Sequence, residues 1–185
     1  MVKFTVTGVK IKEEYVNPFL VPAIQVWEIK LRCSLDIERY FPTSGRDTTE
    51  DITAVIRVKG PLEGNVLYGF DNNTARSVAS VMLGRSVEIL DEVSLSAIGE
   101  LADMISGSAA DELAMAGYLS VINPPLMYQT AGLGFTPHKV KQIQVDFGSS
   151  LGALHVRIGL IEHLGRSQEL SWLQARNQDA ANNGP

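Results

Sequence analysis

Four polar or small residues near the middle of the chain have the spacing of one helical face. In order, they are Ser96, Glu100, Asp103 and Gly107. Residues separated by intervals of four, three and four are neighbours on the surface of an α-helix. An ionised carboxylate on such a face accepts hydrogen bonds, so it can hold a water molecule or act as a base. From spacing alone, a solvent-exposed helix face with a tolerated glycine is the simpler interpretation.

These residues belong to the longest helical pattern in the sequence, which we predict over about residues 91–116, closed by Gly117. Apolar residues recur there every three or four positions, as in the buried stripe of an amphipathic helix. The stripe consists of Ile98, Leu101, Ile105, Ala109, Leu113 and Ala116. The polar face therefore points away from the core. Gly107 costs a helix interior about 1 kcal/mol relative to alanine, but it would let another backbone approach closely.

The sequence gives little support for a metal site or for a nucleophilic catalytic residue. The histidines (His138, His155 and His163) lack the clustered spacing of a metal site, and the single cysteine, Cys33, lies far from them. We therefore predict no metal site in this chain. Because Cys33 lacks a nucleophile signature and no G-x-S-x-G motif is present, we expect Cys33 to be a buried structural thiol.

Two further motifs also have simpler interpretations. The pair Gly132 and Gly134 is not followed by a helical pattern, so it is no dinucleotide-binding fingerprint. The run Asn72-Asn73-Thr74 matches a glycosylation sequon, but Asp71 and the residues after it are also good helix caps. We interpret this run as the start of a helix.

Composition limits the class of protein. The chain has 185 residues, 45% hydrophobic and 20% charged, with a net charge of −5 at pH 7. This length fits one domain with a sizeable core. The acidic balance argues against a nucleic-acid binder, and a single cysteine excludes a disulfide scaffold. No membrane-spanning segment and no secretory signal is evident, so we expect a cytoplasmic protein.

The remaining pattern predicts an α+β fold with a mainly antiparallel sheet. One predicted helix covers about residues 22–31, because two prolines four residues apart, Pro18 and Pro22, are hard to place inside a helix. A second covers about 71–83 and ends at Gly84. Residues 42–50 are turn material and 131–137 are a loop. Predicted strands, including a hairpin broken at Gly60-Pro61, cover 1–12, 52–58, 65–70, 118–122, 141–147 and 153–161.

Residues 60–117 resemble the core of the CheX-type chemotaxis phosphatases, within the wider CheC/CheX/FliY family. The family pattern has a strand hairpin around Glu-Gly, a helix ending in Met-hydrophobic-Gly, and then a long helix with the motif S-A-hydrophobic-G-E-hydrophobic-x-N-M-x-x-G. Its counterparts here are Leu62-Glu63-Gly64, Met82-Leu83-Gly84, Asp91-Glu92 and the run from Ser96 to Gly107, with Pro124-Pro125 after the next strand. The resemblance spans about residues 14–162 and implies a CheC-like fold.

The resemblance implies an enzyme that removes the phosphoryl group from an aspartyl-phosphate on a CheY-like receiver domain. In the family, the long helix inserts its polar face into the receiver's active site. Glu100 would pair with a receiver lysine, and Ser96 and Gly107 would lie in the contact. The divalent metal, usually Mg²⁺, belongs to the receiver, so the phosphatase needs no cofactor of its own. Phosphoryl transfer depends mainly on positioning and charge stabilisation, which suits this arrangement.

One position departs from the family motif. Asp103 stands where the family has an asparagine that orients the attacking water. An amide donates and accepts hydrogen bonds, whereas a carboxylate only accepts them. A carboxylate is also repelled by the phosphoryl group, by about 4 kcal/mol at 4 Å in an effective dielectric near 20. We therefore expect weakened dephosphorylation. The alternatives are a non-catalytic module that binds receivers on the same face and an adapter that keeps only the fold.

The domain organisation expected from the resemblance is a single CheX-like domain over residues 1–185. Its core covers about 14–162, with an added strand at 1–12 and a polar tail at about 166–185. The chain has one copy of the long motif, as in the single-site CheX type. The match Glu14-Tyr15-Val16-Asn17 precedes Pro18 and carries no functional expectation. The family also implies a homodimer formed through the sheet.

Overall fold

A single antiparallel sheet forms the framework of the computed structural model, which describes residues 13–43, 49–134 and 141–163. The seven strands of these ranges have the order β1-β6-β7-β3-β2-β4, and β5 also pairs with β2. The strands are β1 Asp36–Thr43, β2 Ile52–Lys59, β3 Leu62–Phe70, β4 Val121–Ile122, β5 Leu126–Tyr128, β6 Gln142–Ser149 and β7 Gly152–Glu162. The predicted α+β class with a mainly antiparallel sheet is confirmed.

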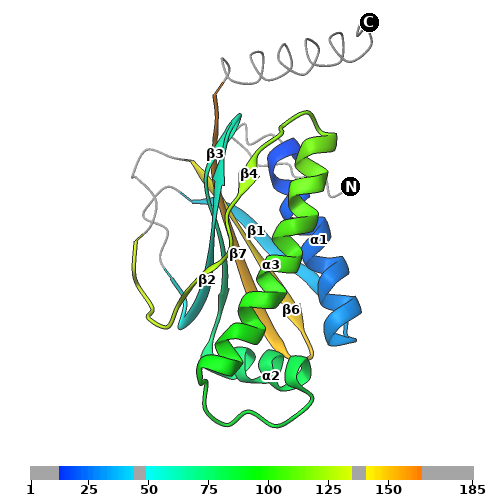
Figure 1. Cartoon of the computed structure of the whole chain (residues 1–185), viewed down its shortest axis with the longest axis vertical. Helices are drawn as coiled ribbons and strands as arrows, with labels where there is room; N and C mark the ends of the chain where they lie inside the picture. The colour runs from blue at the N-terminus through cyan, green and yellow to red at the C-terminus, as the bar shows by residue number, and fades with distance from the viewer. Residues whose placement is uncertain (1–12, 44–48, 135–140, 164–185) are drawn as a thin grey trace, which may run out of the picture.

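Three helices cover one side of this sheet (Figure 1). α1 (Glu13–Leu31) and α3 (Glu92–Met115) pack side by side, and α2 (Asn72–Leu83) lies across one end of them. Alternate residues of each strand point toward the helices. On β2 these are Ile52, Ala54, Ile56 and Val58, all buried in the core. The core is therefore one layer between the sheet and the α1–α3 pair.

The first helix is longer than predicted. α1 begins at Glu13 and includes both Pro18 and Pro22, so the expected start near residue 22 is wrong. Proline inside a helix costs about 3 kcal/mol because it removes a hydrogen bond and crowds the preceding turn. Burial of the aromatic and aliphatic side chains on this helix offsets that cost. They include Phe19, Leu20, Ala23 and Trp27, each fully buried, and the Trp27 ring stacks on Phe70 at 6.4 Å.

The second and third helices begin and end as predicted. The Asp71 carboxylate accepts a hydrogen bond from the Thr74 backbone N–H at 2.7 Å, and this bond lowers the pKa of Asp71. Gly84 closes α2 with a φ of 63°, in the left-handed region that glycine adopts readily. Asp91 caps α3 in the same way as Asp71 caps α2, through Ser94.

The strand predictions are confirmed for the hairpins and wrong in three details. β2 and β3 form one predicted hairpin and β6 and β7 the other. β3 begins at Leu62 instead of residue 65, and β4 covers two residues instead of 118–122. β1 and β5 were not predicted. β1 is an edge strand in which half of the residues are exposed and none is fully buried. It carries charges and Pro42, so it lacks the alternation that indicates a strand.

β4 and β5 form one edge of the sheet in two separate pieces. Val58 of β2 pairs with Ile122, whereas Val55 pairs with Leu126, so the outer chain has one residue more than β2 over this span. Pro124 and Pro125 fall within the interruption. Proline has no N–H to donate to a strand neighbour, so the pair ends the ladder and produces a bulge.

Some expectations fall on residues outside the described ranges. They are the strand at 1–12, residues 44–48 of the turn at 42–50, the tail at about 166–185, His138 and the last part of the loop at 131–137. The predicted start of that turn is wrong, because Pro42 and Thr43 belong to β1. Within the described ranges, each helix is too short or too polar to span a lipid bilayer.

The sheet face that carries no helix is polar. Asp146 on β6 is nearly inaccessible to solvent and binds Arg39, His155 and Gln144, with distances of 2.7 Å to the last two. Arg157 in turn donates to Gln144 at 2.8 Å and to Glu50 at 3.0 Å. Burial alone would raise the pKa of the Asp146 carboxyl, but these hydrogen bonds lower it below the ordinary value of 3.8.

The lowered pKa predicts how stability depends on pH. Since the folded pKa lies below the unfolded one, the Asp146 contribution is complete above about pH 3.8 and is lost as pH falls through the folded pKa. Asp146→Asn should therefore reduce the free energy of unfolding at pH 7. The difference in this free energy between the variant and wild type should become smaller as pH falls to 2.5. Urea titrations across this range measure both. The exposed Asp36→Asn serves as a matched control, and equal pH profiles for wild type and Asp146→Asn would contradict the prediction.

Candidate functional site

The four residues picked out by spacing lie together on the exposed side of α3. Ser96, Glu100, Asp103 and Gly107 are all exposed, and we call this surface the α3 ridge. Along the axis, Glu100 and Asp103 are separated by about 4.5 Å and they differ by about 60° around it. Their carboxylates therefore project from one turn of one helix. The structure brings all four predicted site residues onto one surface.

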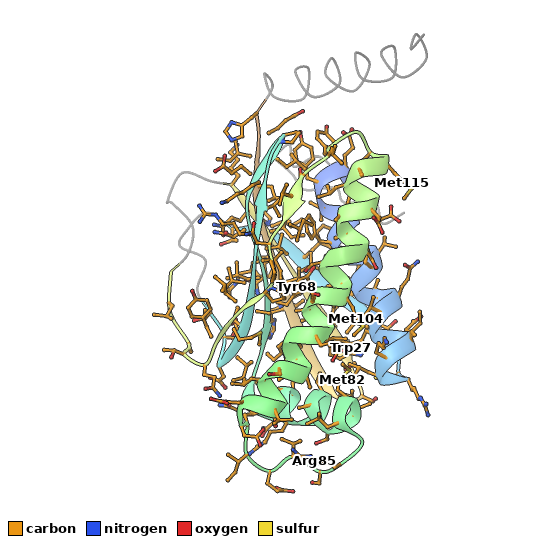
Figure 2. All side chains as sticks on the ribbon, in the orientation of Figure 1. Trp27, Tyr68, Met82, Arg85, Met104 and Met115 are labelled. Carbon is orange, nitrogen blue, oxygen red and sulfur yellow. The ribbon has the colours of Figure 1, made fainter. Side chains whose placement is uncertain are left out.

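The opposite side of α3 holds the helix in place. Five residues of the predicted stripe are buried, namely Ile98, Leu101, Ile105, Ala109 and Leu113. The sixth, Ala116, is an exception, because it is exposed at the C-cap beyond the last turn. Figure 2 shows Tyr68 of β3 between the sheet and α3. Complete burial raises the pKa of the Tyr68 phenol, and the Ser106 side chain of α3 partly opposes this rise.

The two carboxylates of the ridge are free to interact with a partner. Neither Glu100 nor Asp103 has a hydrogen-bond or ion-pair partner among the described residues. α3 carries five acidic residues and no lysine or arginine: the acids are Glu92, Glu100, Asp103, Asp111 and Glu112. The charge on this helix is therefore of one sign. It suits a partner that presents cationic groups.

The two glycines of the motif have different surroundings. A Cβ added at Gly99 would lie 3.5 Å from the Met127 sulfur, in ordinary contact, so Met127 of β5 packs over this glycine. A Cβ added at Gly107 would meet nothing within 4 Å. Packing within the described chain therefore gives no reason for glycine at position 107. A partner that must approach the helix backbone there would supply such a reason.

Two residues of the short motif match on α1, Glu14 and Tyr15, contact Tyr118 beyond the end of α3. The Tyr118 hydroxyl donates a hydrogen bond to Glu14 at 3.0 Å. The Tyr118 ring also meets the Tyr15 ring edge to face, with centroids 5.2 Å apart. Burial is the main cause of a raised pKa for the Tyr118 hydroxyl, and the hydrogen bonds with Tyr15 and Glu14 raise it further. Glu14 thus joins the start of α1 to the segment after α3.

The remaining candidates from the sequence are dispersed. His155 pairs with Asp146 on the helix-free face of the sheet, and His163 lies 3.0 Å from Glu63 near the end of β7. Cys33 is half-buried and packs against the core. In the part of the chain that the structure describes, no three His, Cys, Asp or Glu residues come close enough together to hold a metal ion.

The structure extends the ridge in both directions. Val93 and Asp111 are exposed and lie seven residues before Glu100 and four after Gly107. The same helical spacing could have identified both residues. The spacing places both residues on this face, but only the structure shows that their side chains are exposed.

Comparison with known proteins identifies the family. A family model described as Chemotaxis phosphatase CheX matches residues 52–148, which include all of β2, β3, α2 and α3. The chain belongs to the CheX family. Its sequence is 37% identical over 92 residues to the CheY-P phosphatase CheX of Thermotoga maritima. That match covers 45% of this chain and 59% of the Thermotoga protein.

Solved CheX-like structures share the fold. A CheC-like superfamily protein from Shewanella sp. PV-4 superposes with a TM-score of 0.73 and 23% identity, over 82% of this chain and 99% of that one. A chain of the CheX–CheY–BeF₃–Mg²⁺ complex from Borrelia burgdorferi has a TM-score of 0.69 and 20% identity, over 80% and 98% of the two chains. The predicted CheC-like fold is thereby confirmed.

The surroundings of Gly107 predict the effect of a methyl group there. Gly107→Ala should raise the free energy of unfolding by about 0.5–1 kcal/mol, because alanine is the better helix former and its side chain has room. Urea unfolding monitored by circular dichroism measures the change. Gly64→Ala is a control of opposite sign, since its Cβ would lie 1.9 Å from the Gly159 carbonyl oxygen. Destabilisation by Gly107→Ala would show that the glycine serves packing inside the chain.

Proposed function

We propose that this CheX-family protein dephosphorylates the aspartyl-phosphate of a CheY-like receiver domain, using the α3 ridge. The observation that carries the proposal is the projection of Glu100 and Asp103 from one turn of a firmly packed helix, without partners among the described residues. The relationship to a CheY-P phosphatase from Thermotoga and the Borrelia complex that contains CheY support the choice of partner.

In the proposed reaction, water attacks the phosphorus of the acyl phosphate. The bond between phosphorus and the aspartyl oxygen breaks, inorganic phosphate leaves, and the receiver's carboxylate is restored. Glu100 pairs with a receiver lysine and so fixes the helix in the receiver's active site. Asp103 accepts a hydrogen bond from the attacking water and orients it. The ridge thus contributes position, which is the main requirement of phosphoryl transfer.

The carboxylate at position 103 makes the proposed enzyme slow. Compared with the family's asparagine, Asp103 cannot donate a hydrogen bond to the phosphoryl oxygens, and its charge repels them. The repulsion is about 4 kcal/mol at 4 Å in an effective dielectric near 20. A receiver's Mg²⁺ and lysine offset part of it. We therefore propose weakened turnover with preserved binding.

The same proposal includes the cofactor, the assembly and the compartment. The divalent ion is bound by the receiver, so the phosphatase contributes no cofactor of its own. The protein acts in the cytoplasm, where response regulators are phosphorylated, and forms a homodimer through its sheet. These points follow the family resemblance, and size-exclusion chromatography with light scattering tests the dimer directly.

Two substitutions on the ridge test the proposed roles. With a receiver phosphorylated by a small phosphodonor, substoichiometric wild type should accelerate loss of the phosphoryl group, and Glu100→Ala should reduce this effect at least about tenfold because the pairing with the receiver lysine is lost. Asp103→Asn should increase the rate about tenfold or more, since an amide removes the repulsion and restores a donor. Glu28→Ala and Asp36→Asn, at exposed positions on α1 and β1, are matched controls.

The pattern of rates distinguishes the proposal from its alternative. An inert wild type that binds the receiver, together with an active Asp103→Asn, would identify a receiver-binding module in which the carboxylate abolishes turnover. Absence of binding to any phosphorylated receiver would overturn the proposal and leave only a shared fold. Equal activity of wild type and Glu100→Ala would show that Glu100 takes no part in the reaction.

A further inference from the structure

A hollow of about 610 Å³ lies on the side of the sheet that carries no helix. Val55, Arg57 and Lys59 of β2 line it, because they alternate with residues that point into the core. Asn65 of β3 pairs with Arg57 and also lines the hollow. We call this feature the β2 hollow, and the sheet separates it from α3 (Figure 1). Its volume falls in the range of small-molecule sites, roughly 300–1,000 Å³.

The interrupted edge of the sheet forms one wall of the β2 hollow. The residues of this wall are Asn123, Pro124, Pro125, Leu126 and Tyr128. The Asn123 backbone N–H donates to the Arg57 carbonyl oxygen at 3.0 Å, so the start of the wall is tied to β2. The two prolines have a fixed φ, and β5 is paired with β2. The wall is therefore formed in advance, and a ligand loses little affinity in ordering it.

Two cations in the β2 hollow lack partners. Neither the Arg57 guanidinium nor the Lys59 ammonium has a hydrogen-bond or ion-pair partner among the described residues. By contrast, Arg157 on the same side of the sheet donates to the Glu50 carboxylate at 3.0 Å. No Asp or Glu is among the described residues that line the hollow, although the whole chain has a net charge of −5. The hollow is therefore locally positive and suits an anion.

The charges and their spacing favour a phosphate monoester. Residues two apart on a strand are separated by roughly 6.6 Å, so the long side chains of Arg57 and Lys59 can reach one group. A phosphate monoester carries about −1.5 to −2 at pH 7, which matches two cations, whereas a carboxylate carries one charge. Arginine also binds phosphate oxygens through paired N–H groups. Leu126, 60% exposed, and the half-buried Tyr128 offer apolar surface to the rest of such a ligand.

We propose that the β2 hollow binds a small organic phosphate with an apolar body. Arg57 and Lys59 hold the phosphate group, and Leu126 and Tyr128 contact the body. The ligand binds without reacting, on the other side of the sheet from α3, so the α3 ridge stays accessible. This second site is independent of the proposed dephosphorylation of a receiver.

Binding of 1-naphthyl phosphate to the full chain, measured by isothermal titration calorimetry, tests the site. Arg57→Gln and Lys59→Gln should each raise the Kd about tenfold, because one charge-assisted contact is lost. The wild-type Kd should rise with salt concentration. Leu126→Ser should raise the Kd about fivefold but leave that of inorganic phosphate unchanged, since only the apolar contact is lost. Wild type should bind 1-naphthol and 1-naphthoate at least about tenfold more weakly than the phosphate.

Controls separate the possible outcomes. Lys30→Gln and Arg85→Gln remove exposed cations elsewhere, and they should leave the Kd unchanged. Circular dichroism and the unfolding midpoint check that each variant folds. Failure of 1-naphthyl phosphate to bind at millimolar concentration would overturn the inference, as would equal Kd values for wild type, Arg57→Gln and Lys59→Gln. Tighter binding of 1-naphthoate would overturn the assignment to a phosphate. Glu100→Ala should leave this Kd unchanged, so the site and the proposed function can fail separately.

Discussion

The structure depends on the burial of one side of α3 between α1 and the sheet. That contact fixes the direction of the helix, and with it the direction of every side chain on the opposite side. Ile98, Leu101 and Ile105 cannot leave the core without exposing apolar surface, at a cost of about 1.5–3 kcal/mol each. Glu100 and Asp103 are thereby presented to solvent as a fixed pair. The same helical repeat therefore places the apolar residues of α3 in the core and the residues of the ridge on the surface.

Features with a local cause could be predicted from the sequence. Asp71, Gly84 and Asp91 set the ends of two helices through bonds within a few residues, and the periodicity of α3 separated its buried stripe from its polar face. Features decided by distant contacts could not be predicted. α1 extends through Pro18 and Pro22 because the sheet buries Trp27 and its neighbours, and β1 is a strand because β6 pairs with it. Met127 of the distant strand β5 covers Gly99, whereas nothing comes within 4 Å of a Cβ at Gly107, and spacing alone does not distinguish the two glycines.

In the proposed function, the carboxylate of Asp103 in place of the family's asparagine would act differently on binding and on turnover. A negative ridge attracts the lysine and the metal ion of a receiver, so an added carboxylate strengthens the encounter. The same charge disfavours the phosphoryl group once the surfaces meet. One substitution therefore acts in opposite directions on association and on chemistry.

The proline pair between β4 and β5 has a consequence for the behaviour of the protein at high concentration. Val121 and Leu126 are 66% and 60% exposed along this edge of the sheet. An exposed aliphatic edge is ordinarily a template on which another chain can add a strand and begin to aggregate. Pro124 and Pro125 cannot donate the hydrogen bonds that such a strand would need, and the bulge breaks the straight register. The interruption therefore acts as built-in protection against fibril growth from this edge.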